Sequence, residues 1–212
     1  MKEQLEFIYR RHSVRKFTNA KIPQADFEAL FEAATLAPSG VNIQNWQFVV
    51  IKNPEQIKEL AEIVVKKVHS IANRTKNEEL KKSLIGKIPY QTVFKEAPYV
   101  VLVFAGEYPT AWPELLAEGV IDPEEFQRLM RPNPAVQNTS AAMENLLLAA
   151  AALGYGGCWM TGPTIAAKEI SEFVGFEKEG YHLVSMTPLG VPAFEGKNPP
   201  RKPLSEVVTF KK

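Results

Sequence analysis

Residues 38–51, PSGVNIQNWQFVVI, join a polar turn directly to a run of aromatic and β-branched residues. The run from residue 46 to residue 51 is of the kind that packs on a pleated, buried surface, and it predicts a core strand. The turn before it is crowded with side-chain amides and hydroxyls. The sequence therefore predicts a core strand at residues 46–51 that is preceded by a polar turn.

Helical and strand patterns alternate on both sides of this stretch. Pro23 opens a run with helical apolar spacing, Asn53-Pro54 is a typical helix start that predicts a helix to about residue 71, and Asp122-Pro123 predicts another. The remaining expected elements are helices at 136–153 and 165–173 and strands at 98–104, 155–159 and 182–189. This mixture predicts one domain over residues 1–212, with a sheet of four or five strands covered by helices.

The composition is that of an ordinary globular domain. The 212 residues are 45% hydrophobic and 23% charged, and a formal net charge of +1 gives no general attraction to nucleic acid or membrane. Cys158 is the only cysteine and is expected to be a small buried residue, so no cysteine-based zinc site or other metal site is assigned. The charged start and the short apolar run at 146–153 predict neither a signal peptide nor a membrane span, and a cytoplasmic location is expected.

Three separated segments carry polar or glycine residues that core packing does not require. Residues 10–16, RRHSVRK, could hold a phosphomonoester, although cations also suit a solvated helix end. Residues 37–46 could hydrogen-bond the edge of a flat heterocycle, although they are also common turn residues. Residues 154–163, GYGGCWMTGP, would let a ligand approach the backbone, but they follow a helix and precede a strand, the wrong order for a dinucleotide-binding motif.

In this order and spacing the three segments resemble the nitroreductase family of flavoproteins. The matching motifs are at 11–15, 38–46 and 154–162, with a C-terminal set at 190–192 and 200–204, so that the resemblance spans about residues 5–208. It implies an α+β fold with a mostly antiparallel central sheet. It also implies an intertwined homodimer with FMN at its interface, in which residues 203–212 form an arm to the partner subunit.

The first motif implies roles at the two ends of the cofactor. Arg11 and Arg201 match positions that bind the FMN phosphate, and Ser13 matches a position at the flavin edge or the ribityl chain. Arg15 stands where the family carries a cation near flavin N1 and O2, where its charge would stabilise the reduced cofactor. His12 belongs to the same motif and is either a further contact or a structural residue.

The other motifs imply contacts with the flavin ring. Thr161 and Gly162 fall where the family offers a backbone amide to flavin N5. Pro38, Ser39 and Gly40 match a stretch that touches the flavin from the partner subunit. Asn42 matches an amide that hydrogen-bonds the isoalloxazine.

Two departures from the family pattern stand out. Asn45 occupies a position where many relatives have proline, and is expected to loosen the turn slightly. A polar pair that several relatives bring to the flavin from the region 70–95 has no evident counterpart; Asn73, Arg74 and Lys87 are the candidates.

The implied activity is ping-pong transfer of hydride from NADH or NADPH through FMN to a nitroaromatic, a quinone or another conjugated acceptor. No side chain is assigned a catalytic role, because the cofactor carries the chemistry. Residues 107–133 are expected to form a wall or lid that contacts the substrate through Trp112 and Phe126, or else a surface excursion.

Three alternatives remain. One is a specialised flavoenzyme of the same fold that dehalogenates, dehydrogenates or cleaves flavin, and another is a flavin-binding protein without turnover. A module that binds phosphate or nucleic acid through residues 10–16 is disfavoured by the near-neutral charge and the lack of a second basic stripe.

Overall fold

A four-stranded antiparallel sheet forms the centre of the protein, which is seen here in a computed structural model that describes residues 2–211. The expectation of an α+β fold with four or five mostly antiparallel strands is confirmed. Strand order is β1-β2-β4-β3, and a register irregularity lies between Val103 and Phe104 of β2. The strands are β1 (Trp46–Ile51), β2 (Tyr99–Gly106), β3 (Gly156–Gly157) and β4 (Tyr181–Gly190).

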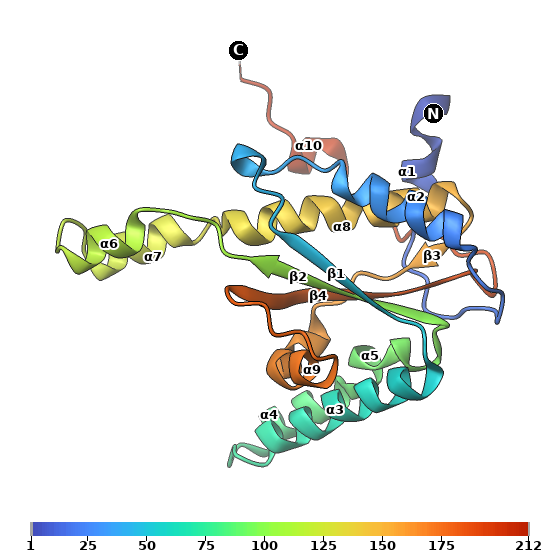
Figure 1. Cartoon of the computed structure of the whole chain (residues 1–212), viewed down its shortest axis with the longest axis horizontal. Coiled ribbons are helices and arrows are strands. Elements are labelled where there is room, and N and C mark those ends of the chain that lie inside the picture. The colour runs from blue at the N-terminus through green and yellow to red at the C-terminus, as the bar shows by residue number, and fades with distance from the viewer. Residues whose placement is uncertain (1, 212) are drawn as a thin grey trace.

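β2 is buried along its whole length because helices pack on both faces of the sheet. Val100, Leu102 and Phe104 point to one face, where they pack in a cluster with α3 (Pro54–Ala72) and α9 (Ala167–Phe173). The alternate residues face α2 (Gln24–Thr35) and α8 (Pro134–Ala152) on the other side. The two layers lie above and below the sheet in Figure 1.

Local capping explains where several helices begin. The Asn53 side chain accepts hydrogen bonds from the backbone of Glu55 at 2.9 Å and of Gln56 at 3.4 Å, with Pro54 as the first helical residue. Asp122 caps α7 (Pro123–Met130) in the same way, through Glu125 N at 2.8 Å. Both predicted helix starts are therefore confirmed.

Some connecting segments differ from the sequence-based expectation. Part of the polar stretch after α3 is helical, in α4 (Glu78–Gly86) with Asn77 as its cap, and α5 (Ile88–Gln91) follows it. The strand expected at 155–159 is only two residues long, and a 3₁₀ turn, η4 (Gly162–Ala166), precedes α9. Two further 3₁₀ turns are η2 (Gly40–Asn42) and η3 (Val93–Glu96).

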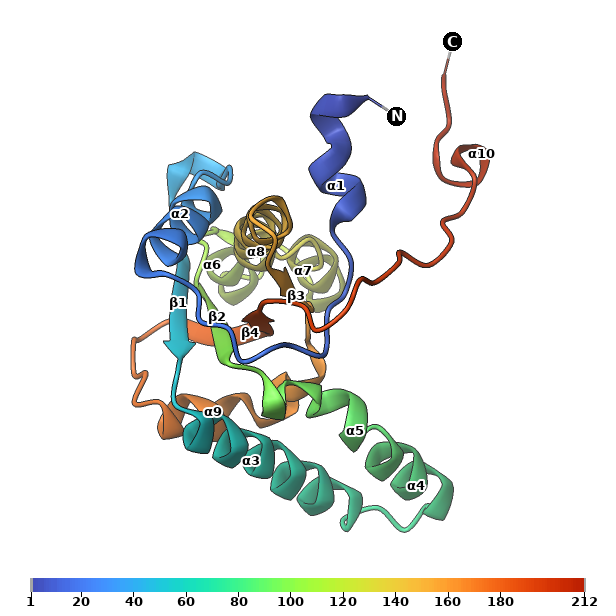
Figure 2. The same ribbon diagram turned by 90° about the vertical axis from the view of Figure 1, so that its right-hand side faces the viewer.

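Three segments project from this body (Figures 1 and 2). An arm formed by α6 (Trp112–Ala117) and α7 extends beyond the sheet, and no residue of either helix is buried. The N-terminal part, η1 (Glu3–Leu5) and α1 (Glu6–Arg10), and the tail that carries α10 (Leu204–Val207) extend on one side. Among the described residues of the tail the large apolar side chains are exposed, and Phe210 is 89% exposed.

No helix within residues 2–211 combines the length and the apolar character that crossing a membrane requires.

Candidate functional site

The N-terminal motif lies against the glycine-bearing segment. Ser13 forms a parallel bridge with Gly157, and the Val14 amide donates to the Gly157 carbonyl at 2.8 Å. Gly156 permits this approach, because a Cβ there would lie 2.4 Å from Val14 Cγ2. Two of the three polar segments, which are far apart in the sequence, are thus brought side by side.

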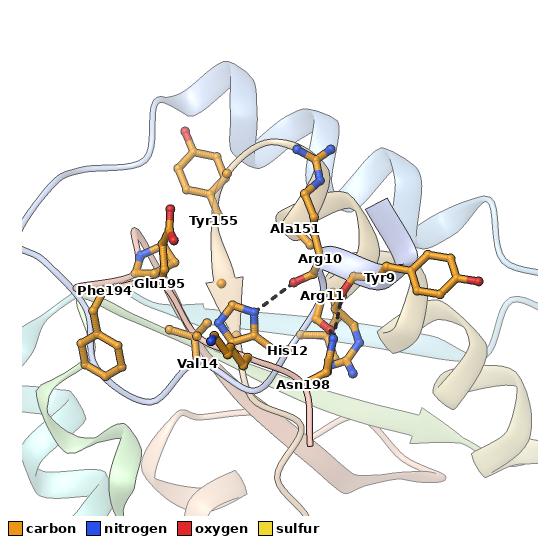
Figure 3. A pocket seen from close by; sticks show the side chains of 17 residues that line it. Tyr9, Arg10, Arg11, His12, Val14, Ala151, Tyr155, Phe194, Glu195 and Asn198 are labelled. Carbon is orange, nitrogen blue, oxygen red and sulfur yellow. Dashed lines mark hydrogen bonds between the residues drawn. The ribbon is translucent and has the colours of Figure 1, made fainter. Parts of the chain in front are cut away.

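A cavity of about 760 Å³ opens on one side of this contact, and we call it cavity 1 (Figure 3). It lies between the N-terminal segment, the last turns of α8 and residues 192–198. His12 is held there by its Nδ1 atom, 2.9 Å from the Arg10 carbonyl, and its ring packs against Gly196, where a Cβ would lie 2.2 Å from Nε2. The cationic and histidine side chains that line cavity 1 are Arg10, Arg11, His12 and Lys197.

Asn198 links the two arginines that were expected to hold a phosphate. Its Nδ2 donates to the carbonyls of Tyr9 at 2.8 Å and Arg11 at 2.9 Å, and its Oδ1 accepts from Arg201 Nη2 at 3.3 Å. The Asn198 side chain therefore connects Arg201 to the backbone of the Arg11 segment. Arg201 itself does not line cavity 1. Sequence reasoning missed Asn198, which no motif distinguishes from other asparagines.

The other contacts of this region fix its electrostatics. Arg11 Nε lies 3.7 Å from Glu144 Oε1, and burial raises the pKa of Glu144 above its ordinary value of 4.5 although Arg11 acts in the opposite direction. Tyr155 donates to the carboxylate of Asp26, and this hydrogen bond raises the pKa of the phenol to about 12. The phenol therefore stays protonated at neutral pH and ties the glycine-bearing segment to α2.

A second cavity, of about 370 Å³, lies on the Arg15 side of the contact, and we call it cavity 2. Thr161 and Gly162 line it together with Arg15, as the sequence predicted for one site. Lys87, Tyr90 and Gln91 also line it, and their spacing of three and four residues puts them on one face of the helical turn of α5. None of the described lining residues is acidic, so the two cations face no carboxylate within this cavity.

Gln91 carries the clearest mark of a missing partner. Its Oε1 atom is buried and has no hydrogen-bond partner within residues 2–211. Gly162 leaves room for this side chain, since a Cβ there would lie 2.9 Å from Gln91 Cγ. A buried acceptor without a donor is costly, and its presence in a cavity indicates a ligand or an ordered water that supplies one. Of the three candidates from the region 70–95, only Lys87 lines a cavity; Asn73 and Arg74 line neither.

The third polar segment, residues 38–44, is elsewhere in the chain. It packs near the start of α8, where the Gly40 amide donates to Asn138 Oδ1 at 3.2 Å, whereas Arg11 pairs with Glu144 further along that helix. Pro38, Ser39, Gly40 and Asn42 line neither cavity. Val41, Asn42 and Gln44 all have left-handed backbone conformations, which are strained for a β-branched residue such as Val41.

Asn45 does not loosen the turn, contrary to the expectation from the sequence. It is only 3% exposed, and its Nδ2 donates to the Gly106 carbonyl at 2.6 Å while its Oδ1 accepts from Asn138 Nδ2 at 3.0 Å. The side chain thus contributes two buried hydrogen bonds that a proline could not make.

Trp112 and Phe126 belong to α6 and α7 and line neither cavity of their own chain. Figure 1 shows these two helices projecting beyond the sheet. Both side chains are half-buried, on the two helices that pack against each other. Within one chain, therefore, the arm covers neither cavity.

The chain shares its sequence pattern and its fold with flavoproteins. The profile of the Nitroreductase family matches residues 8–191. The crystal structure of a BluB-like flavoprotein from Clostridium difficile 630 is 38% identical, with a TM-score of 0.85 and full coverage of both chains. A nitroreductase with bound FMN from Desulfitobacterium hafniense is 26% identical, with a TM-score of 0.68 and full coverage of both chains.

Curated relatives have more than one activity in their names. A putative NADH dehydrogenase/NAD(P)H nitroreductase from Archaeoglobus fulgidus is 28% identical over 76% of this chain and 68% of its own length. An iodotyrosine deiodinase from Nematostella vectensis is 26% identical over 95% of this chain and 72% of its own length.

Proposed function

The chain belongs to the Nitroreductase family, and on that premise we propose that it is an FMN-dependent oxidoreductase with NADH or NADPH as its hydride donor. The proposed acceptor is a nitroaromatic, a quinone or a similar conjugated molecule. The observation that carries this proposal is the lining of cavity 2, which combines Arg15 and Lys87 with Gln91, Thr161 and Gly162. Within residues 2–211 the buried Gln91 Oε1 has no hydrogen-bond partner.

These residues fit the pyrimidine edge of a flavin. That edge offers an N–H donor, which the buried acceptor of Gln91 lacks, and it gains negative charge on reduction, which two cations would stabilise. Cavity 1 also lies within the usual size range of ligand sites, roughly 300–1,000 Å³. In this proposal the exposed backbone of Thr161 and Gly162 faces the reactive part of the ring.

Arg11 and Arg201 would hold the phosphate end. Their planar guanidinium groups suit a phosphomonoester, and Asn198 holds the two segments together without adding charge. Ser13 would contact the ribityl chain from its exposed position, and His12 would support the motif through its hydrogen bond to Arg10.

A second copy of the chain would complete the site. The loop 38–44 and the arm carry proposed flavin and substrate contacts but lie away from the cavities of their own chain. Val41 is 83% exposed in a strained conformation, and the apolar tail is also uncovered, which suits surfaces that a partner covers. We therefore infer a homodimer in which Pro38, Ser39, Gly40, Asn42, Trp112 and Phe126 act on the partner's cofactor.

Bound FMN would supply the redox chemistry, since its N5 atom can accept hydride from the nicotinamide and pass it to the acceptor in a ping-pong sequence. The side chains of this protein would orient the cofactor and stabilise its reduced form. Arg15 and Lys87 supply positive charge where negative charge develops, and no carboxylate among the described lining residues of cavity 2 opposes them. The protein need not move a proton at this edge.

The absorbance spectrum of the purified protein tests the proposal, followed by anaerobic addition of NADH and then NADPH. We expect flavin bands that bleach with at least one donor and return when a nitroaromatic or a quinone is added. A colourless protein that fails to take up FMN would refute flavin binding, and bands that persist with both donors would refute the reductase activity.

The similarity to the BluB-like flavoprotein favours a second candidate. That structure matches with a higher TM-score, 0.85, than the FMN-bound nitroreductase at 0.68. A specialised flavoenzyme that dehalogenates, dehydrogenates or cleaves flavin, or a flavin-binding protein without turnover, would retain its flavin bands with both nicotinamide donors. Chemical reduction of the bound flavin with dithionite, followed by admission of oxygen and analysis of the flavin products, would then separate cleavage from simple binding.

A further inference from the structure

Two buried asparagines join the loop 38–44 to the base of the arm. Asn138 Nδ2 donates to Asn45 Oδ1 at 3.0 Å, and Asn45 Nδ2 donates to the Gly106 carbonyl at 2.6 Å. At the other end, Asn138 Oδ1 accepts from the Gly40 amide at 3.2 Å. Hydrogen bonds therefore run without a break from Gly40 to Gly106, and the two asparagines are 3% and 8% exposed.

We call this series of hydrogen bonds the relay. Its two ends lie in different segments, the loop 38–44 and the base of the arm. Gly40 belongs to the strained loop, and Gly106 is the last residue of β2 before the arm begins at residue 107. The arm returns at Asn133, which caps α8 through a hydrogen bond from Val136 N, and Asn138 lies in the next turns of that helix. The loop and both ends of the arm thus meet around one pair of amides.

Tyr108 adds a packing contact to the same junction. It is the second residue of the arm, and its ring lies against Gly40, where a Cβ would be 2.6 Å from the Tyr108 hydroxyl oxygen. Asn45, Asn138 and Gly106 are buried and Gly40 is partly buried. Moving the arm base without the loop would therefore leave the buried amides of the two asparagines unpaired away from water. Breaking a hydrogen bond at one end should therefore destabilise the backbone at the other end.

We propose that Asn45 and Asn138 are positioning residues that make the loop 38–44 and the arm base one unit, so that an acceptor that displaces the arm also shifts the loop. The consequence for catalysis rests on the proposed function, in which loop and arm both contact the cofactor site. The mechanical coupling does not depend on it.

Hydrogen exchange measured by mass spectrometry on the purified, flavin-loaded protein tests the coupling. The variant is Asn138→Ala, and its matched control is Asn145→Ala on the same helix, where the amide donates instead to the Ala33 carbonyl of α2 at 3.1 Å. We expect Asn138→Ala to speed exchange about fivefold to tenfold both in the loop 38–44 and in residues 106–112. The control and the centre of β2 should exchange as in the parent protein.

A response confined to the loop, or an equal response with Asn145→Ala, would overturn the coupling. If Asn138→Ala does not fold, Asn133→Ala removes the cap of α8 at the arm's return, where the hydrogen bonds of Asn133 stay within residues 130–137. This variant must still speed exchange in the loop, and no change there would count equally against the proposal. The positioning role has its own readout: the visible circular dichroism of the bound flavin should change with Asn138→Ala and not with Asn145→Ala. An unaltered spectrum would refute the positioning role even if the exchange data confirmed the coupling.

None of these readouts requires turnover. Bleaching by NADH can therefore fail while the exchange pattern confirms the coupling, and the reverse result would leave the reductase activity intact while refuting the relay.

Discussion

Arg11 and Glu144 form an ion pair in which Arg11 Nε lies 3.7 Å from Glu144 Oε1. The arginine belongs to the segment that lines cavity 1, and the glutamate belongs to α8. Burial of Glu144 outweighs this attraction and raises the pKa of its carboxyl group. The arginine expected to bind phosphate is thus held by a carboxylate that is itself partly desolvated.

We predict that Glu144→Gln raises the melting temperature at neutral pH. A raised folded-state pKa means that folding favours the protonated acid, so the ionised form costs stability once the pH exceeds the ordinary value of 4.5. The gain should vanish below that pH. Thermal unfolding from about pH 4 to pH 8 measures this gain in melting temperature. A lower melting temperature at neutral pH would show that the ion pair dominates.

Glu144→Gln should also tighten FMN binding, because the FMN phosphate would no longer compete with Glu144 for Arg11.

Arg11→Ala and Arg201→Ala are each expected to weaken FMN retention by about 1.5–3 kcal/mol, through loss of a charge-assisted phosphate contact. Flavin content after dialysis measures the effect. Arg74→Ala is the control, because Arg74 is exposed and lines neither cavity. Flavin content equal to that of the parent protein in both variants would remove these arginines from the site.

Trp112→Ala should alter acceptor preference more than FMN affinity, because the arm is proposed to wall the substrate rather than to hold the cofactor. The ratios of kcat/KM across several nitroaromatics and quinones, set against flavin content, measure this. Constant ratios would mean that Trp112 does not contact the acceptor.

Gly162→Ala should change the flavin spectrum and weaken FMN binding, because its Cβ would lie 2.9 Å from Gln91 Cγ and push that side chain aside. Gly86→Ala is the matched control, since a Cβ there meets nothing within 4 Å. Unaltered spectra and FMN affinity in Gly162→Ala would argue that Gln91 has no part in binding.

Asn45→Pro should lower the free energy of unfolding by about 2–4 kcal/mol, the scale of losing two buried hydrogen bonds. Chemical denaturation of the two proteins side by side measures this. A variant as stable as the parent protein would show that the relay contributes little to folding.

The sheet and its helix starts could be predicted because their signals are local. The aromatic and β-branched run of β1, together with the caps at Asn53 and Asp122, depends only on neighbouring residues. Helix α4 was missed because none of its residues is buried, so it carries a weak apolar pattern.

The site residues that escaped prediction depend on distant partners. Asn198 bonds to the Arg11 carbonyl across 187 positions of sequence, and Asn45 meets Asn138 across 93. Gln91 matters only because Gly162 gives it room. An isolated asparagine or glutamine has no sequence pattern that reveals such a partner. The cations of residues 10–16, by contrast, form a cluster that can be recognised in the sequence.

The docking of Ser13 on Gly157 and of Phe17 on Pro192 bears on when the site can assemble. During synthesis Ser13 and Phe17 are made well before their partners, which follow 144 and 175 positions later in the sequence. A nascent chain that ends before β4 contains Gly157 but not Pro192, and therefore lacks part of the surface on which this segment docks. Cofactor loading is consequently expected only after translation of most of the chain, and an exposed, unplaced N-terminus marks the molecules that have not yet matured.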